Sequence, residues 1–363
     1  MKKIAIILIV FALILPAIVQ AQDFNFEEQL RQLATKNAQG YVGPFATAFG
    51  TSMNSGFYHT AKPHSFLGFD ISVKAALVSI PDEGMVYDFY VGSATVAADP
   101  AWMIPNNELT VDLELLYPER ESPTLFGNNE VNVIQPAPNG AADALESALL
   151  GAGKTQAEID MLKLTPAWNG AVNQIQSGAV PLTTPMGFDL PTVGFAMAQA
   201  SLGLPFGTEV MLRMLPEYDV PDVGKITLYG FGIKHNLDQY IPIPLFPVDI
   251  SAQFAMQQFK VGDFLESNHT MWNIQASKKL GFGISFTPYI GLGMETSTID
   301  INYLVEGSGT ILDGETVTFE LEGDNAFRTT VGFNLTLLLL TINADYSMGE
   351  YDAVTIGAGI TFR

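Results

Sequence analysis

The last eleven residues of the chain, AVTIGAGITFR, alternate between apolar and small or polar side chains without a break. Because successive side chains of a β-strand point to opposite faces, this period of two predicts a strand with one apolar and one polar face. The same alternation recurs in 67–77, 193–202, 209–215, 226–234, 250–257, 272–277, 282–305, 315–337 and 342–348, with 45–53 as a further candidate. So many half-apolar strands must cover their apolar faces, either with each other in a β-sandwich or with lipid around a β-barrel.

The N-terminal sequence MKKIAIILIVFALILPAIVQA has the order of a secretory signal peptide. Two lysines precede an apolar run over 4–19, and the small-residue motif VQA follows it. A membrane anchor is the alternative, but the run is short for one and contains Pro16. We therefore expect cleavage of residues 1–21, which makes Gln22 the first residue of an exported chain. No second apolar run reaches the ~20 residues that a spanning helix needs.

Composition separates the two fold classes. Charged residues make up 15% of the chain and hydrophobic residues 48%, whereas soluble domains are typically ~25% charged. The chain contains no cysteine, which excludes disulfides and thiol chemistry. An exported, strand-rich chain with little charge, 33 glycines and 24 phenylalanines predicts an all-β fold: an antiparallel transmembrane β-barrel in the outer membrane. There, lipid covers the outward faces and closure pairs every strand.

The strand number follows from the count of alternating segments. About eleven segments alternate, and bacterial barrels nearly always have an even number of strands. Either one strand is hidden within 82–114 or the segment 45–53 is not a strand, and we expect twelve to fourteen strands. The last strand should end on the periplasmic side, where connections are short. The long pair 282–305 and 315–337 predicts a hairpin whose tip, EGSGTILDGE, stands outside the membrane.

Two segments lack the pattern of barrel wall. Within 23–39, Phe26, Leu30 and Leu33 share one helical face, which predicts a short amphipathic helix that either plugs the lumen or trails into the periplasm. Residues 118–190 are rich in Pro, Asn and Gly, and they predict a long, partly helical insertion on the outer side. The expected organisation is a signal peptide (1–21), an N-terminal helix or plug (22–40) and a barrel (41–363) that contains this insertion.

Charged residues on the polar faces of the expected strands are candidates to line the lumen. They are Asp70, Lys74, Glu209, Arg213, Lys234, Arg328 and Asp345. Charge pairs among them would either stiffen a narrow barrel or line a conduit, and the sequence leaves both open. Phe362, near the end of the last strand, resembles the terminal aromatic that the barrel-assembly machinery reads on outer-membrane proteins, although Arg363 follows it.

Net charge and motif searches exclude several other functions. A formal net charge of −21 excludes nucleic acid as a partner. The acidic residues gather in expected loops, which fits solvated outer loops or, alternatively, capture of divalent cations without an ordered ligand site. GAGKT (151–155) lacks the first glycine of a phosphate loop, and the four histidines form no H-E-x-x-H motif. We assign no catalytic, cofactor-binding or metal-binding residue and expect no enzyme activity.

The stretches GYVGPFATAFGTSMNSGFYHTAKPHSFLGFDISV (40–73), YGFGIKHNLDQYIP (229–242) and the terminal ITFR resemble an uncharacterised family of exported barrel proteins. The expected architecture is also distantly similar to the FadL-like fatty-acid transporters, although no ligand motif matches. That likeness implies passive passage or binding of small hydrophobic molecules. The alternative is a structural or surface-interaction barrel without transport, which a filled lumen would favour. The expected partners are the lipid bilayer, the barrel-assembly machinery and small hydrophobic ligands.

Overall fold

The computed structural model describes residues 35–220, 224–242, 247–304 and 316–362. The chain divides into two compact units, one made of Met1–Asp82 and Leu190–Arg363 and the other of Glu83–Asp189. The expected signal peptide, most of the helix expected over 23–39 and the hairpin tip EGSGTILDGE lie outside the described residues. None of the described helices is long and apolar enough to cross a bilayer.

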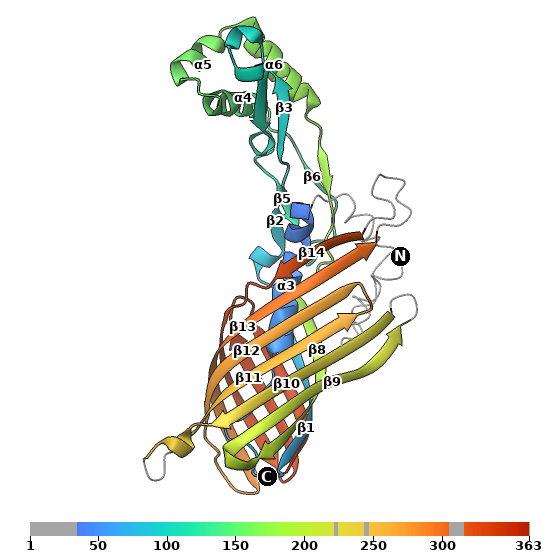
Figure 1. Ribbon diagram of the computed structural model, residues 1–363, viewed down its shortest axis with the longest axis vertical. Helices are drawn as coiled ribbons and strands as arrows, with labels where there is room; N and C mark the ends of the chain where they lie inside the picture. Colours follow the sequence, from blue (N-terminus) through green and yellow to red (C-terminus); the bar gives the residue numbers. More distant parts are fainter. Residues whose placement is uncertain (1–34, 221–223, 243–246, 305–315, 363) are drawn as a thin grey trace. The chain divides into compact units, whose positions relative to one another are not determined.

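The first unit is a closed antiparallel β-barrel (Figure 1). Its wall strands are β1 (Phe69–Ser79), β8 (Thr192–Leu204), β9 (Thr208–Val220), β10 (Gly224–Asn236), β11 (Asp249–Val261), β12 (Leu265–Ser277), β13 (Ile284–Leu304), β15 (Phe327–Leu337), β16 (Leu340–Met348) and β17 (Ala353–Phe362). Each pairs with its neighbours, and β1 closes the ring by pairing with both β8 and β17. Closure leaves no unpaired wall edge among the described strands, as a spanning sheet requires.

The barrel class is confirmed, but the expected number of twelve to fourteen strands is wrong, because the described ring has ten. Residues 45–53, a candidate strand, lie in helix α3 (Thr35–Asn54). There Phe45 and Phe49 are one helical turn apart and their rings stack at 5.4 Å, a spacing that a short run shares with strand alternation. Residues 83–114 belong to the second unit and add no wall strand. β14 (Thr316–Glu322) pairs with the end of β13 beyond the ring.

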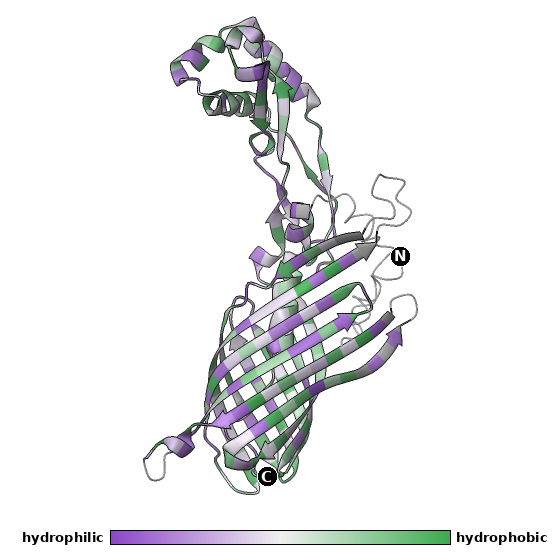
Figure 2. Cartoon of the chain, viewed as in Figure 1, coloured by the Kyte–Doolittle hydropathy of each residue, from purple (hydrophilic) through white to green (hydrophobic). Residues whose placement is uncertain are grey.

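The wall strands present their apolar side chains outward. In β17, Val354, Ile356 and Ile360 are 40–53% exposed, whereas Thr355 and Thr361 between them are buried. The other wall strands repeat this arrangement, and hydrophobic and hydrophilic residues alternate along their ribbons in Figure 2. A continuous exposed apolar surface of this kind marks contact with a membrane. The alternation therefore places apolar side chains toward lipid and polar ones inside, the reverse of a soluble domain.

Helix α3 lies in the interior of the barrel (Figure 1), and most of the segment that follows it, residues 55–64, is buried there. Tyr41, Ala46 and Met53 are fully buried, and Phe57 is nearly so. Gly50 lets the helix lie directly against the wall, because a Cβ there would come within 2.5 Å of the Ser297 Cβ in β13. The barrel thus has a core, and its own N-terminal segment supplies that core.

The second unit has three helices and three two-stranded sheets. The helices are α4 (Gly140–Gly151), α5 (Gln156–Leu162) and α6 (Pro166–Gly178), and the sheets pair β2 (Val86–Asp88) with β5 (Glu121–Pro123), β3 (Ser93–Ala97) with β4 (Glu108–Asp112) and β6 (Asn132–Ile134) with β7 (Leu182–Thr184). Short 3₁₀ turns cover Asp82–Gly84, Pro100–Trp102, Pro105–Asn107 and Leu113–Leu115 here, and Pro205–Gly207 and Asp238–Tyr240 in the barrel. The unit begins at Glu83, whereas the sequence suggested an insertion from residue 118.

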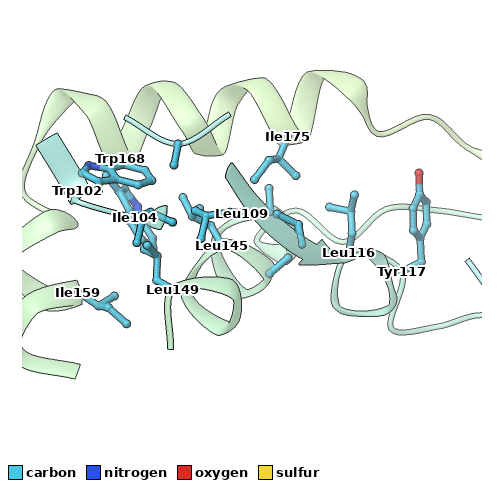
Figure 3. Packing of buried hydrophobic residues seen from close by; sticks show 14 of the residues in the cluster. Trp102, Ile104, Leu109, Leu116, Tyr117, Leu145, Leu149, Ile159, Trp168 and Ile175 are labelled. Carbon is cyan, nitrogen blue, oxygen red and sulfur yellow. The ribbon is translucent and has the colours of Figure 1, made fainter. Parts of the chain in front are cut away.

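Local sequence signals explain where the helices of this unit begin. Thr155 and Glu158 form a reciprocal capping box at the start of α5. Thr165 caps α6, and Pro166 occupies the first helical position, where a missing N–H is tolerated. A separate core, which includes Trp102, Leu145, Leu149, Trp168 and Ile175, holds the helices to the β3–β4 sheet (Figure 3).

Candidate functional site

The barrel lumen holds all seven charged residues that the sequence nominated as lumen-lining. Their side chains lie on the inner face of the wall, and each residue is at most 6% exposed. They fall into four clusters, each described below, and every cluster contacts α3 or residues 55–64. The sequence pattern did not identify these luminal partners, since nothing in it placed this segment opposite the strands.

Glu209 joins the luminal segment, which consists of α3 and residues 55–64, to the wall. Its contacts at the C-terminal end of that segment involve the strands β9, β10 and β17. One carboxylate oxygen accepts from Lys234 Nζ of β10 at 2.9 Å. The other accepts from the His64 backbone N–H at 2.8 Å and lies 2.7 Å from His64 Nδ1. His64 Nε2 in turn lies 2.9 Å from Thr361 Oγ1 of β17. Buried charges are tolerated when paired and hydrogen-bonded in this way.

Arg213 holds the C-terminal end of α3. Its guanidinium donates to the Met53 carbonyl at 2.8 Å, to the Ser55 carbonyl at 2.7 Å and to Gln199 Oε1 at 2.9 Å. The last carbonyls of a helix have no intrahelical partner and carry partial negative charge, so a cation is the natural partner. The guanidinium also lies 3.5 Å from the centre of the Phe57 ring, within cation–π range.

Arg328 contacts the same end of α3 from the opposite side of the ring. It donates to the Thr51 carbonyl at 2.8 Å and to Ser55 Oγ at 2.7 Å, and it pairs with Glu295 of β13 at 2.9 Å. Asn325 also donates to Glu295. Two arginines from β9 and β15 thus hold the helix end between them.

The fourth cluster consists of Asp70 and Lys74 of β1 and Asp345 of β16. Lys74 Nζ donates to Asn343 Oδ1 of β16 at 2.6 Å and lies 3.3 Å from His59 Nδ1. Asp345 accepts from the Tyr289 hydroxyl at 2.8 Å. Asp70 accepts from Ser72 Oγ at 2.8 Å. The wall and the luminal segment are therefore one hydrogen-bonded assembly rather than a wall with a loose insert.

A small cavity lies inside the barrel, among the described residues. This cavity of about 20 Å³ lies at the end of α3, lined by Asn54, Tyr58, Glu295, Arg328 and Asp345 among others. That volume holds about one water molecule. The Asn54 side-chain amide is buried and has no protein partner, so it would form hydrogen bonds with a water molecule in this cavity.

A larger hollow lies on the outer surface of the wall. Its volume is about 560 Å³, and its lining includes Ile233, Phe254, Trp272, Leu292 and Met294. The rings of Phe254 and Trp272 lie 4.4 Å apart. Because it faces outward on the lipid side, this hollow can accept an acyl chain or another small apolar molecule.

The remaining candidates occupy structural positions. Phe362 is half-exposed on the outer face and stacks on Phe69 at 6.0 Å, and its role as an assembly signal stays a prediction. GAGKT joins α4 to α5, where Thr155 serves as a helix cap. His59, His64 and His269 are buried in the barrel. Within the described residues no three His, Cys, Asp or Glu side chains are grouped to hold a metal ion.

These features define a class: a closed, outwardly apolar β-barrel filled by its own N-terminal helix and carrying a compact unit between two wall strands. The chain belongs to a family of unknown function, DUF6588, whose pattern matches residues 1–362. The expected membership of an uncharacterised barrel family is thereby confirmed.

Comparison with curated proteins and solved structures identifies no function for this chain. No curated protein matches the chain. Among solved structures, the in-vitro folded outer membrane protein OmpT of Vibrio cholerae has 8% identity and a TM-score of 0.22, over 46% of this chain and 55% of its own. The chain thus spans about half the length of that protein. A loop-deletion mutant of OmpT has 9% identity and a TM-score of 0.23, over 81% of this chain and 98% of its own. The fold assignment rests on the strand pairing described above.

Proposed function

We propose that the protein is an outer-membrane anchor that carries the Glu83–Asp189 unit at the cell surface for interaction, rather than a pore. The observation that carries this proposal is the filled lumen. Arg213 and Arg328 hold the end of α3, and Glu209 holds His64, with all of these side chains buried. A plug with such contacts is part of the folded barrel. The proposal includes no catalytic activity, cofactor or nucleic-acid partner, and it requires the bilayer and the barrel-assembly machinery.

The lengths of the connections support an orientation. At the end of the barrel where β17 finishes, the links are 205–207, 237–248, 278–283 and 338–339. At the opposite end lie the β13–β14 extension and the attachment of the Glu83–Asp189 unit, which enters between Ser79 of β1 and Thr192 of β8. Outer-membrane barrels have short periplasmic turns and longer external connections. This supports an external position for the unit.

The surface of this unit suits interaction. Residues 83–189 contain 14 acidic and three basic side chains. Large apolar side chains are nevertheless exposed on it, including Met103 at 80%, Met161 at 64% and Leu164 at 86%. A soluble module that exposes apolar side chains amid negative charge favours a partner with apolar and basic groups.

Conductance and labelling test the proposal. In planar bilayers the whole protein should give no steady open-channel conductance, and a variant without residues 83–189 should behave alike because its lumen is still filled. In intact cells, a membrane-impermeant maleimide should label Leu164→Cys, since the chain has no other cysteine. Steady conductance by the whole protein, or protection of Leu164→Cys in intact cells, would contradict the proposal. A variant without α3 serves as the positive control for an open lumen.

A second function, binding of small hydrophobic molecules, is favoured by the hollow on the outer wall. Its apolar lining and size suit one acyl chain. Brominated fatty acid in the bilayer should quench Trp272, whereas Leu292→Phe, which narrows the hollow without adding a fluorophore, should reduce the quenching. Flux of fatty acid into liposomes above that of protein-free liposomes would extend the function to passage, and its absence would limit it to binding.

A further inference from the structure

The luminal segment has a definite direction through the barrel. Asp324, which follows β14, donates its backbone N–H to Thr47 Oγ1 at 3.0 Å. One turn of helix further along, Thr51 contacts Arg328 at the start of β15. The Ala61 N–H then donates to Ser277 Oγ, at the end of β12, at 2.9 Å. His64 finally reaches Thr361, beside the last described residue of β17.

Strand directions assign these contacts to the two ends of the barrel. Phe69 at the start of β1 pairs with Phe362 at the end of β17, so both lie at one end. Because neighbouring wall strands are antiparallel, β12, β15 and β17 run toward that end, and their final residues lie there. β14 pairs with the far part of β13, at the opposite end. The segment 47–64 therefore descends from the β14 end to the β17 end, and α3 begins at the β14 end.

Packing at the β14 end suits a helix that enters there. Thr47 and Gly50 face β13 and the residues after β14, and a Cβ on Gly323 would lie 3.1 Å from the Ala46 carbonyl oxygen. Phe319 and Leu321 of β14 are buried, and α3 is in contact with β14. β14 and the extension of β13 thus form a collar on one side of the helix. Lys36 and Gln39, near the start of α3, are exposed.

We infer that the chain threads its own barrel from outside to inside, so that the N-terminal end of α3 opens at the cell surface. This inference rests on the orientation given under the proposed function. It puts the start of α3 at the same end of the barrel as the attachment of the Glu83–Asp189 unit. The start of α3 is then exposed at the cell surface.

Single-cysteine labelling tests the threading direction, because the natural chain has no cysteine. Gln39→Cys reports the start of α3, and Lys36→Cys is a second position for the same end. Glu350→Cys, in the exposed β16–β17 turn, is the reference for the β14 end, and Lys278→Cys, in the exposed β12–β13 turn, is the reference for the β17 end. A membrane-impermeant maleimide is added to intact cells and to cells with permeabilised outer membranes, and folding is checked by heat-modifiable migration.

We expect full labelling of Gln39→Cys and Glu350→Cys in intact cells. Lys278→Cys should be labelled only after the outer membrane is permeabilised. Labelling of Glu350→Cys without Gln39→Cys or Lys36→Cys would overturn the threading while leaving the orientation intact. Labelling of Lys278→Cys alone would overturn both the orientation and the surface position of α3. The three patterns separate failure of this inference from failure of the proposed function.

Discussion

Glu209→Gln is the most informative single perturbation of the filled lumen. Glu209 is 2% exposed, and its carboxylate compensates Lys234 at 2.9 Å while accepting from the His64 N–H at 2.8 Å. Glutamine keeps the shape and one acceptor oxygen but removes the charge, which leaves the Lys234 ammonium buried without a counter-ion. Removing one partner of a buried pair costs about 3–5 kcal/mol. We expect a loss of this size in the free energy of unfolding.

The double variant Glu209→Gln/Lys234→Met separates the charge effect from the packing effect. Replacing both members of a buried pair by uncharged groups is often neutral or stabilising. We therefore expect the double variant to recover most of the loss, to within about 1–2 kcal/mol of the natural chain, a remainder of the size of one hydrogen bond. Lys234→Met alone leaves Glu209 uncompensated and should resemble Glu209→Gln.

Urea titration of protein folded in detergent or lipid vesicles measures these differences, with the heat-modifiable band as the signal for folded barrel. Stability is obtained by linear extrapolation, provided that the slope is the same for all variants. A cost below about 1 kcal/mol for Glu209→Gln, where breaking a buried pair should cost several, would refute the idea that this cluster holds the luminal segment. A double variant as unstable as the single one would refute the electrostatic explanation.

Three further predictions follow from separate parts of the chain. Gly50→Ala should cost about 1–3 kcal/mol by overpacking against Ser297, measured by the same urea titration, and Ser297→Gly should recover much of it; no loss in Gly50→Ala would mean that the helix does not lie against β13. Phe362→Ala removes the expected assembly signal and should lower the amount of heat-modifiable barrel in outer-membrane fractions, and normal assembly would place the signal elsewhere. In the second unit, hydrogen bonds from Thr155 hold the pKa of Glu158 below its ordinary value. The stabilisation is therefore complete above the ordinary glutamate pKa and lost as pH falls through the lowered one. The protection of α5 amides, measured relative to their intrinsic exchange rate at each pH, should therefore fall on acidification; unchanged protection in the natural chain, matching Glu158→Gln, would contradict this.

Much of the wall was predictable from sequence because strand periodicity is local. Ten of the alternating segments overlap wall strands, and the apolar faces point outward as expected. The segment 45–53 was assigned wrongly, since Phe45, Phe49 and Met53 satisfy both a strand and a helix pattern over so short a run. Tertiary packing decides between them: inside a ring whose wall is already paired, a new strand has no partner, whereas a helix satisfies its own backbone.

The sequence by itself determined the fold class, the lipid-facing side of each strand and the seven charged residues directed inward, because alternation along a strand assigns each side chain to a face. The tertiary structure alone decided what those charges meet. Arg213 binds helix carbonyls rather than an acidic side chain, and Glu209 binds His64 of the luminal segment. These partners are separated by well over a hundred residues in sequence. No local pattern encodes such pairings, which arise when ring closure brings the wall around α3.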